Sequence, residues 1–354
     1  MGESNPSPSS FVNERLIYAY GFSQWKKSVV KRLFPEHRIS FIRQLDVIVR
    51  SGERCTLVVW GQLLLGELPN SVKVIRLEDG FLRSVGLGAD LIRPLSWVKD
   101  ERGIYYDASC ASDLEILLQS SVFSELLLKR AEQFRQKVVA KGLTKYNDGT
   151  SNWSRSDLAQ RIILVPGQVE SDASLKYGAP GIRQNMSLLA AVRDANPDAY
   201  ILYKPHPDVL AGLRASGINE SEAFSLCNEV IVGEHMGKLL LQVDEVHVLT
   251  SLAGFEALLR GKSVTCYGQP FYAGWGLTND ILPLKRRTRK LSLDELVAGA
   301  LLQYPSYFSV SDGRLTTPER AVDDLLEWRA RVGSAVPFWR KLFRIVLRRI
   351  VGVR

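Results

Sequence analysis

The sequence predicts an α/β protein with two Rossmann-like domains in series that face a central cleft. The chain has 354 residues, which is enough for two domains at roughly 100–200 residues each. In both halves, short apolar runs alternate with amphipathic ones, a pattern typical of parallel βα units. Hydrophobic residues make up 45% and charged residues 24% of the chain. This composition is that of an ordinary globular protein and excludes wholesale disorder and collagen.

The first domain is expected over residues 13–143, after a polar, Pro- and Ser-rich lead at residues 1–12 that is expected to be disordered. Its strands are predicted from three apolar runs, at residues 16–20, 55–60 and 72–77. A helix-like pattern between the first two runs covers residues 23–34 and stops at Pro35, because proline lacks the N–H group that a helix interior needs.

Two further features are predicted in this domain. Residues 95–107 contain two strand-like runs around a turn at residues 99–103, which predicts a hairpin. Ser112, with Glu115 three residues later, predicts a capping box at the start of a helix. A longer amphipathic run over residues 123–142 predicts the next helix.

A second domain follows a predicted linker. Residues 144–158 lack apolar periodicity and contain many turn-forming residues, so we expect an interdomain linker there. The βα alternation then restarts and predicts a Rossmann-like domain over residues 159–305, whose ligand would bind beyond the carboxyl ends of the strands. Residues 306–335 are expected to form a C-terminal helical segment. Two Rossmann-like domains facing a cleft form the GT-B arrangement of many glycosyltransferases, although a fold alone does not fix a function.

The formal net charge of +8 is concentrated at the C-terminus. The chain has 46 basic and 38 acidic residues, but residues 329–354 contain no acidic one, and the rest of the chain is neutral. A nucleic-acid-binding domain would carry its excess charge on the folded body, so nucleic acid is not an expected partner. Residues 336–354 combine arginines spaced four apart with bulky apolar side chains, which predicts an amphipathic helix on an anionic membrane surface. The alternative is a helix that packs back on the first domain.

The cysteines and the N-terminus predict a cytoplasmic protein that is peripheral on the inner membrane through this tail. The four cysteines form no CxxC pair. Cys55 and Cys266 lie within apolar runs, as free thiols do in a reducing compartment. The N-terminus has no basic region followed by an apolar one, so no signal peptide is expected.

Common nucleotide-binding and hydrolase motifs are absent or incomplete. The GKS tripeptide at residues 261–263 lacks the earlier glycine of a P-loop and follows a helix rather than a strand. The GLG tripeptide at residues 86–88 lacks the third glycine of a dinucleotide-binding loop. There is no HExxH, no GxSxG and no Asp-x-Asp at a predicted strand end. We therefore expect neither a metal nor a bound cofactor.

Polar residues follow predicted strands of the second domain, where a ligand is expected. Lys204, His206 and Pro207 come after one strand, and the prolines around His206 fix the backbone so that the imidazole can meet a phosphate. Thr250 and Ser251 join another strand to a helix, where hydroxyl and free N–H groups form an anion site. The alternatives are a turn histidine and an ordinary N-cap.

Carboxylates occupy two further strand ends. The loop at residues 165–174 is expected to carry Glu170 and Asp172 into the cleft, as candidates for a nucleophile or base; otherwise it is only a connection. Glu78 and Asp79 end a strand of the first domain. Since neighbouring side chains of a strand point to opposite sides, only one of them is expected to reach the cleft.

Arg83 is a candidate cation near these carboxylates. It lies four residues after Asp79 and can pair either with an acidic group of a substrate or with Asp79 itself. The sequence does not decide between these pairings.

Five segments of the chain have a family resemblance when they are taken together. They are RLEDGFLRSVGLGADLIRPLSWVKDERGIYYD, VPGQVESDAS, YKPHPDV, DEVHVLTSLAGFEALLRGKSVTCYG and QPFYAGWGLTND. In sequence and order they resemble the bacterial capsule polysaccharide β-Kdo transferases, which transfer the acidic sugar Kdo. The resemblance extends over residues 77–280 and is weaker before residue 53 and after residue 305.

The resemblance implies a retaining GT-B glycosyltransferase that takes Kdo from CMP-β-Kdo without a metal. In related retaining enzymes a carboxylate forms a covalent intermediate, and the matching position here is Asp172. The family's His-Pro motif falls on His206 and Pro207, where the histidine meets the CMP phosphate. Its Glu-Asp-Gly motif begins at Glu78 and Asp79, and the resemblance implies acid or base catalysis by Glu78.

The resemblance also implies a donor site and a cation for the Kdo carboxylate. The candidate donor-binding residues are Gln168, Lys204, His206, Pro207, Thr250 and Ser251. The candidate cations for the carboxylate are Arg83, Lys204 and Arg183, and the sequence does not choose among them.

The implied acceptor is a glycolipid or a Kdo-terminated glycan. The capsule enzyme carries two transferase modules in tandem, whereas this chain is long enough for one. This difference leaves open whether the pathway is that of capsule or of lipopolysaccharide. It also leaves open a transferase for another CMP-nonulosonate, such as a sialic acid relative, and a non-catalytic glycan- or lipid-terminus-binding subunit of a polysaccharide export complex.

Overall fold

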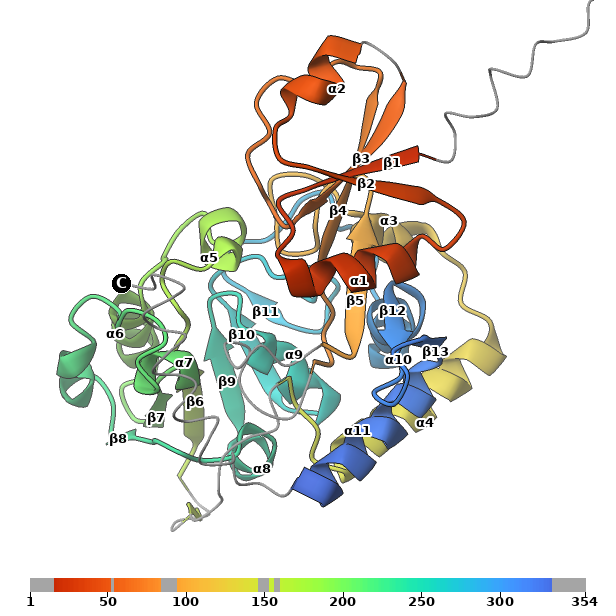
Figure 1. Cartoon of the computed structure of the whole chain (residues 1–354). Coiled ribbons are helices and arrows are strands. Elements are labelled where there is room, and N and C mark those ends of the chain that lie inside the picture. Colours follow the sequence, from red (N-terminus) through yellow and green to blue (C-terminus); the bar gives the residue numbers. More distant parts are fainter. Residues whose placement is uncertain (1–15, 52–53, 84–93, 146–152, 156–159, 333–354) are drawn as a thin grey trace, which may run out of the picture.

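A computed structural model describes residues 16–51, 54–83, 94–145, 153–155 and 160–332. Within these residues the chain forms two β-sheets flanked by helices (Figure 1), so the predicted α/β class is confirmed. The expected lead at residues 1–12 and the basic tail at residues 336–354 lie outside the described part. Among the described helices, none has both the length and the apolar character needed to cross a membrane.

The first sheet has the strand order β13-β12-β5-β4-β3-β1-β2. Its parallel strands are β1 (Leu16–Tyr20), β2 (Arg38–Ile42), β3 (Cys55–Trp60) and β4 (Val72–Asp79). Its antiparallel strands are β5 (Ser96–Asp100), β12 (Pro305–Phe308) and β13 (Leu315–Thr316). Helix α1 (Gln24–Leu33) packs on the face that carries Val58, and helix α2 (Asp46–Ser51) packs on the opposite face.

The predicted hairpin at residues 95–107 is wrong. Its first run forms β5, but the backbone N–H groups of Arg102 and Gly103 donate to Asp100 Oδ1 at 3.0 and 2.9 Å. These bonds turn the chain away from the sheet after β5. The free edge of β5 then pairs with β12, which arrives from much later in the sequence.

The helical segment expected at residues 306–335 is correct only in its second part. The segment begins in strand β12, because Tyr307 and Phe308 fill the core beside β5 and are each only 2% exposed. The short strand β13 follows, and the helix α11 (Pro318–Val332) comes after it.

The second sheet is parallel throughout and has the order β11-β10-β9-β6-β7-β8. Its strands are β6 (Ile162–Pro166), β7 (Tyr200–Lys204), β8 (Glu229–Val230), β9 (Glu245–Val248), β10 (Ser263–Cys266) and β11 (Asn279–Asp280). Counted along the chain, this is the 3-2-1-4-5-6 order of a Rossmann sheet. The strand order reverses between β6 and β9, and such folds bind their ligands at the carboxyl ends of these strands.

The helices of this half connect its parallel strands. They are α5 (Ala173–Gly178), α6 (Asn185–Ala195), α7 (Pro207–Leu210), α8 (Met236–Gln242) and α9 (Leu252–Leu259). Helices α7 and α9 begin within a few residues of the carboxyl ends of β7 and β9, and a loop at residues 167–172 joins β6 to α5. These connections build one side of the cavity described below.

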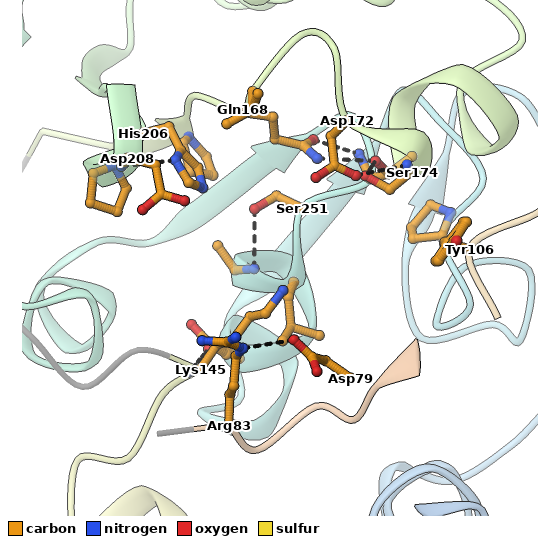
Figure 2. Close-up of a pocket in the computed structure, with 18 of the residues that line it drawn as sticks. Asp79, Arg83, Tyr106, Lys145, Gln168, Asp172, Ser174, His206, Asp208 and Ser251 are labelled. Carbon is orange, nitrogen blue, oxygen red and sulfur yellow. Dashed lines mark hydrogen bonds and ion pairs between the residues drawn. The ribbon is translucent and has the colours of Figure 1, made fainter. Parts of the chain in front are cut away.

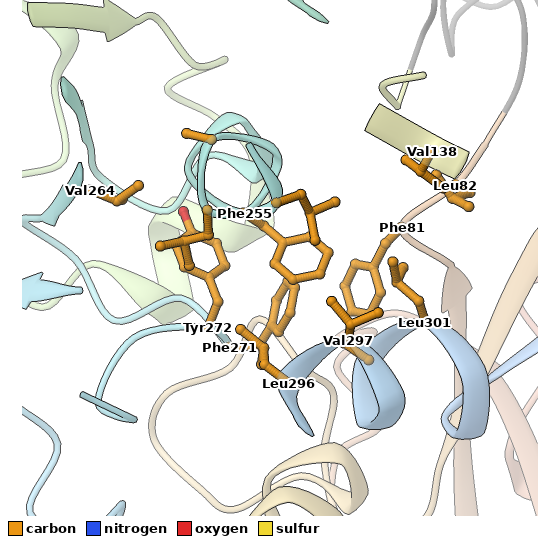
Figure 3. Close-up of a cluster of buried hydrophobic side chains, with 14 of the residues drawn as sticks. Phe81, Leu82, Val138, Phe255, Val264, Phe271, Tyr272, Leu296, Val297 and Leu301 are labelled. Atoms are coloured by element: carbon orange, nitrogen blue, oxygen red, sulfur yellow. The ribbon is translucent and has the colours of Figure 1, made fainter. Parts of the chain in front are cut away.

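The two sheets are joined by a shared apolar core (Figure 3). Phe81, just after β4, stacks on Phe271 with ring centroids 4.2 Å apart, and it also contacts Phe255 of α9. Three further helices close this core: α4 (Glu125–Ala140), α10 (Leu293–Val297) and the π-helical segment η4 (Ala298–Gln303). The apolar joint fixes the end of β4 against α9.

The predicted capping box at Ser112 is half confirmed. Ser112 Oγ accepts the N–H of Glu115 at 3.1 Å and caps helix α3 (Asp113–Ser120). The carboxylate of Glu115 does not return to the cap, because it binds the guanidinium groups of Arg286 and Arg287. Glu115 therefore links α3 to the segment after β11.

Candidate active site

A cavity of about 540 Å³ lies between the two sheets, at the carboxyl ends of β3 and β4 in the first sheet and of β6, β7 and β9 in the second. The first sheet lines it with Trp60 at the end of β3 and with Glu78 and Asp79 at the end of β4. The second sheet lines it with the segments that follow β6, β7 and β9. In the view of Figure 2, His206 and Asp208 lie on one side of Ser251, and Asp79 and Arg83 lie on the other.

The structure brings together nearly all the site residues that the sequence predicts. Those that line the cavity are Glu78, Asp79, Arg83, Gln168, Asp172, Lys204, His206, Pro207, Thr250 and Ser251. Arg183 is the exception: it is exposed and outside this lining, and its Nε donates to Ala179 O at 2.8 Å. The reason is its place before α6, where the side chain turns back on the preceding loop.

Gln168 ties together the two central strands of the second sheet. Its Oε1 accepts the N–H of Thr250 at 2.9 Å, and its Nε2 donates to Thr250 Oγ1 at 3.1 Å. Asn185 in turn accepts the N–H of Gln168 and donates to its carbonyl, both at 2.9 Å. These bonds use both ends of the Gln168 amide and hold the carboxyl ends of β6 and β9 at a fixed separation.

Ser251 is the N-cap of helix α9. Its Oγ accepts the N–H of Ala253 at 3.3 Å, and its backbone is non-helical, with φ −59° and ψ 137°. Ser251 is therefore an N-cap, as the predicted alternative states. The helix that it caps also begins at the cavity. The positive end of its dipole adds to the attraction of the cavity for an anion.

His206 is held as a neutral hydrogen-bond donor. The N–H of Asp208 donates to its Nδ1 at 3.1 Å, so the proton of the neutral ring is on Nε2. Burial, reinforced by the positive charge of Lys145, lowers the pKa of His206 to about 4. Pro207 occupies the first turn of α7, and the fixed backbone leaves the Nε2–H group as the donor that His206 can offer in the cavity.

Asp172 caps helix α5 and lines the cavity. Its Oδ1 accepts the N–H of Ser174 at 2.9 Å, and among the described residues its Oδ2 has no hydrogen-bond partner. Glu170, expected to enter the cleft with it, lies outside the lining. Its carboxylate instead accepts the N–H groups of Asn185 at 2.8 Å and Ile218 at 3.1 Å. The loop therefore presents one carboxylate to the cavity.

Glu78 and Asp79 both reach the cavity, so the expectation that only one of them does is wrong. Strand β4 ends at Asp79, so the alternation of side-chain directions along the strand stops at this pair. Glu78 Oε1 accepts the N–H of Asp79 at 3.0 Å. Tyr106 donates to Glu78 Oε2 at 3.4 Å. Burial and the neighbouring negative charge of Asp79 raise the pKa of Glu78 to about 7.

Arg83 pairs with Asp79, as one of its two predicted alternatives states. Its Nε lies 2.7 Å from Asp79 Oδ2, and the two side chains are only 7% and 18% exposed. Ser96 packs directly against Gly80, leaving no room there for a side chain. The close approach brings β4 and β5 together beneath the ion pair.

The polar lining residues that the sequence analysis does not identify include Tyr106, Lys145, Asp208, Arg214, Glu234 and Glu256. Tyr106 and Asp208 lie inside segments that carry the family resemblance, so their signal is present but is not distinguished from that of their neighbours. Lys145 falls in the predicted linker, where no residue pattern indicates a site. In the described part of the chain, no group of three or more His, Cys, Asp or Glu side chains is arranged to hold a metal ion.

Comparison with known proteins places the chain among capsule proteins. A family model described as capsule polysaccharide biosynthesis protein matches residues 68–153 and 144–308. Over 318 residues the chain is 41% identical to the capsule polysaccharide modification protein LipA of Neisseria meningitidis, covering 88% of this chain and 45% of LipA. It is 39% identical to the lipopolysaccharide-processing protein LpsZ of Rhizobium meliloti, covering 88% and 74% of the two chains. The chain thus spans less than half the length of LipA.

Two solved structures share the fold. One is the beta Kdo 2,7 transferase of Thermosulfurimonas dismutans KpsC, at 45% identity and a TM-score of 0.74 over 88% of this chain and 99% of that chain. The other is the beta Kdo 2,4 transferase of the same KpsC, at 28% identity and a TM-score of 0.74 over 88% and 98%.

Proposed function

Because the chain belongs to the capsule polysaccharide biosynthesis family, we propose that it is a retaining β-Kdo transferase with the GT-B fold. The donor is CMP-β-Kdo, and the acceptor is a glycolipid or a Kdo-terminated glycan of capsule or lipopolysaccharide biosynthesis. The similarity to the two KpsC transferases supports this proposal. The observation that carries it is the cavity, which combines carboxylates from facing sheet ends with a histidine that donates a hydrogen bond.

The phosphate of CMP is bound at the β7 side of the cavity. The Nε2–H group of His206 donates to a phosphate oxygen, while Lys204 and the N-terminus of α9 supply positive potential. The leaving group is a phosphate monoester, whose charge increases as the bond to the sugar breaks. Donors that are already in position stabilise this developing charge without rearrangement. We propose that no metal takes part in this step.

Asp172 is the nucleophile in this proposal. Its Oδ2 attacks the anomeric carbon of Kdo, the bond between that carbon and the phosphate oxygen breaks, and CMP leaves with the electron pair. The bond from Oδ1 to the Ser174 N–H keeps the carboxylate oriented. The acceptor oxygen then attacks the same carbon and displaces Asp172. Two inversions give net retention.

Glu78 is the base for the second step. When it is ionised, it takes the proton of the acceptor hydroxyl as the new glycosidic bond forms. The pKa of about 7 makes the ionised carboxylate a stronger base than an ordinary glutamate, while it is still populated at neutral pH. The hydroxyl group of Tyr106 orients this carboxylate through the bond to Oε2.

The test is incubation of the chain with CMP-Kdo and a synthetic Kdo-terminated acceptor, followed by NMR spectroscopy of the product. The proposal predicts a β-linked Kdo product that forms equally well in the presence of a metal chelator. CMP-sialic acid serves as the competing donor. No transfer from CMP-Kdo, an α-linked product, or a preference for CMP-sialic acid would contradict the proposal.

A further inference from the structure

Gln168 begins a chain of hydrogen bonds that runs through two hydroxyl groups along the wall of the cavity. Its Oε1 accepts the N–H of Thr250 at 2.9 Å, so the other end of the amide, Nε2, faces the Thr250 hydroxyl. Nε2 donates to Thr250 Oγ1 at 3.1 Å, and Thr250 Oγ1 donates to Ser174 Oγ at 3.3 Å. Because Nε2 can only donate, the Thr250 hydroxyl accepts this bond and directs its own proton to Ser174.

The proton at the end of this chain belongs to Ser174. Thr250 is one of the candidate donor-binding residues, but its N–H and its hydroxyl proton both have acceptors within the protein. Ser174 Oγ accepts the bond from Thr250, and in the described part of the chain no acceptor takes its hydroxyl proton. Ser174 is partly buried and lines the cavity. Its hydroxyl proton is therefore available to a ligand in the cavity, whereas that of Thr250 is not.

Ser174 lies beside the proposed nucleophile. Its backbone N–H donates to Asp172 Oδ1 at 2.9 Å, within the first turn of α5. In the view of Figure 2, Ser174 and Asp172 lie on one side of Gln168, and His206 lies on the other. The Ser174 hydroxyl is thus on the side of the sugar that Asp172 attacks, away from the phosphate that His206 is proposed to bind.

We propose that the Ser174 hydroxyl donates a hydrogen bond to the carboxylate of the transferred sugar. The inference rests on the proposed function and adds the group that recognises the acid. The anomeric carbon of a 2-keto acid sugar carries the phosphate, the ring oxygen, a ring carbon and the carboxylate. Of the three groups that stay with the sugar, only the carboxylate is an anion, and bonds to an ionised acceptor are the strongest that a hydroxyl can donate.

A hydrogen bond to this carboxylate also offsets a repulsion within the proposed reaction. Asp172 Oδ2 attacks the carbon that carries the carboxylate, so two anions approach each other in a cavity that is partly shielded from water. A cation at this position would pair with Asp172 as well and weaken it as a nucleophile, whereas a neutral hydroxyl stabilises the sugar carboxylate alone. Because Ser174 accepts a bond from Thr250, its own O–H group is polarised and donates more strongly.

The test compares ligands that differ only in this carboxylate. Calorimetry gives the dissociation constants of CMP-Kdo, of an analogue in which hydrogen replaces the carboxylate, and of CMP. Every full-length protein also carries Asp172→Asn, which keeps an acceptor that can cap α5 and prevents consumption of the donor. Ser174→Ala is the test variant. Ser187→Ala, which is exposed on α6 and outside the cavity, is the matched control.

The expected result is a loss that depends on the carboxylate. Ser174→Ala should weaken the binding of CMP-Kdo by about 10- to 100-fold and change the binding of the analogue and of CMP by no more than about twofold. Thr250→Val removes the hydroxyl that donates to Ser174 but leaves the Ser174 proton in place. Its ratio of the dissociation constants of the analogue and CMP-Kdo should therefore stay within about threefold of that of the Asp172→Asn parent. Ser187→Ala should match the parent for all three ligands.

Three results would overturn the inference. If Ser174→Ala weakens all three ligands alike, Ser174 is a structural residue, and if it weakens none of them, Ser174 does not contact the donor. If Thr250→Val causes the larger selective loss of CMP-Kdo binding, Thr250 contacts the carboxylate instead. Failure of the proposed function gives a different result, because the Asp172→Asn parent itself would then bind neither CMP nor CMP-Kdo.

Discussion

Glu78 and His206 are buried titratable residues whose pKa values are shifted in opposite directions. Burial disfavours the charged form of each, so the pKa of Glu78 rises to about 7 and that of His206 falls to about 4. At neutral pH the histidine is therefore a neutral donor, and the glutamate exists in both forms. Such separation of pKa values assigns different roles to two groups in one cavity.

The pH dependence of transfer follows from the pKa of Glu78. Glu78 must be ionised to accept the proton of the acceptor, and its ionised fraction decreases as the pH falls below about 7. We expect kcat/KM for the acceptor to fall by about tenfold per pH unit on the acidic side. Glu78→Gln should lower kcat/KM by roughly 100- to 10,000-fold and abolish this acidic limb. The exposed Glu67→Gln is the control; an acidic limb that persists in Glu78→Gln would assign it to another group.

His206 should affect the rate through the leaving phosphate. We expect His206→Ala to remove roughly 2–4 kcal/mol of transition-state stabilisation, as the loss of one preorganised donor does. Because Nδ1 also caps α7, His206→Asn serves as the control that keeps a capping acceptor. Single-turnover rates with CMP-Kdo measure the effect. Turnover by His206→Ala equal to that of wild type would reduce His206 to a structural residue of the turn.

Strand-end reasoning predicts which residues line the cavity better than it predicts their hydrogen-bond partners. Asp172 and His206 could be predicted because polar residues directly follow buried strands of a parallel sheet. Glu170 follows the same strand as Asp172 but binds backbone N–H groups of another loop. That choice depends on loop geometry that no local pattern specifies. Lys145 is at the cavity because of a long-range bond to Glu256, which sequence spacing does not indicate.

At the scale of elements, buried parallel strands were predictable and sheet edges were not. Strand β6 has five buried residues in succession, which gives a continuous apolar run. Strand β2 is only partly buried, and its sequence RISFI has no such run. The second half of the predicted hairpin at residues 95–107 is apolar enough for a strand. The edge of β5 is nevertheless taken by β12, which is distant in sequence.

The link from α3 to Arg286 and Arg287 should be important for stability. Glu115 is 5% exposed and Arg287 is 7% exposed, so Glu115→Gln leaves a buried guanidinium without its anion. We expect a loss of about 3–5 kcal/mol in the free energy of unfolding, measured by urea denaturation. The matched control is Glu319→Gln, which breaks the exposed pair with Arg130 and should cost no more than about 1 kcal/mol. Equal losses in the two variants would contradict the importance of the buried link.

At the scale of the molecule, the cavity lies over an apolar joint between the two sheets. Phe81 and Phe271 hold the end of β4 against the second sheet, so the proposed base, Glu78, and the proposed nucleophile, Asp172, are positioned by one shared core. Helix α11 belongs to the same body, since Leu325 is fully buried and Trp328 packs against the core. Any truncation that tests the basic tail must therefore spare α11.

The tail at residues 336–354 is predicted to bind an anionic membrane. Its cations contribute up to about 1 kcal/mol each near such a surface, and the apolar side chains add a contribution that salt does not screen. Truncation after Val332, where α11 ends, should release the enzyme from phosphatidylglycerol vesicles and leave its rate on a soluble acceptor unchanged. Sedimentation with vesicles measures the binding. If truncation instead unfolds the protein or abolishes soluble activity, the tail packs on the folded body.

The covalent intermediate on Asp172 is the most direct test of the account. Glu78→Gln should form the glycosyl-enzyme normally but transfer it slowly, because the base of the second step is missing. The negative control is Glu78→Gln combined with Asp172→Asn, since asparagine also caps a helix N-terminus but is not a carboxylate nucleophile. Intact-protein mass spectrometry of Glu78→Gln with CMP-Kdo should show the addition of one Kdo, and peptide mapping should locate it on Asp172. An adduct on another residue, or an unmodified enzyme that still transfers Kdo with retention, would contradict the account.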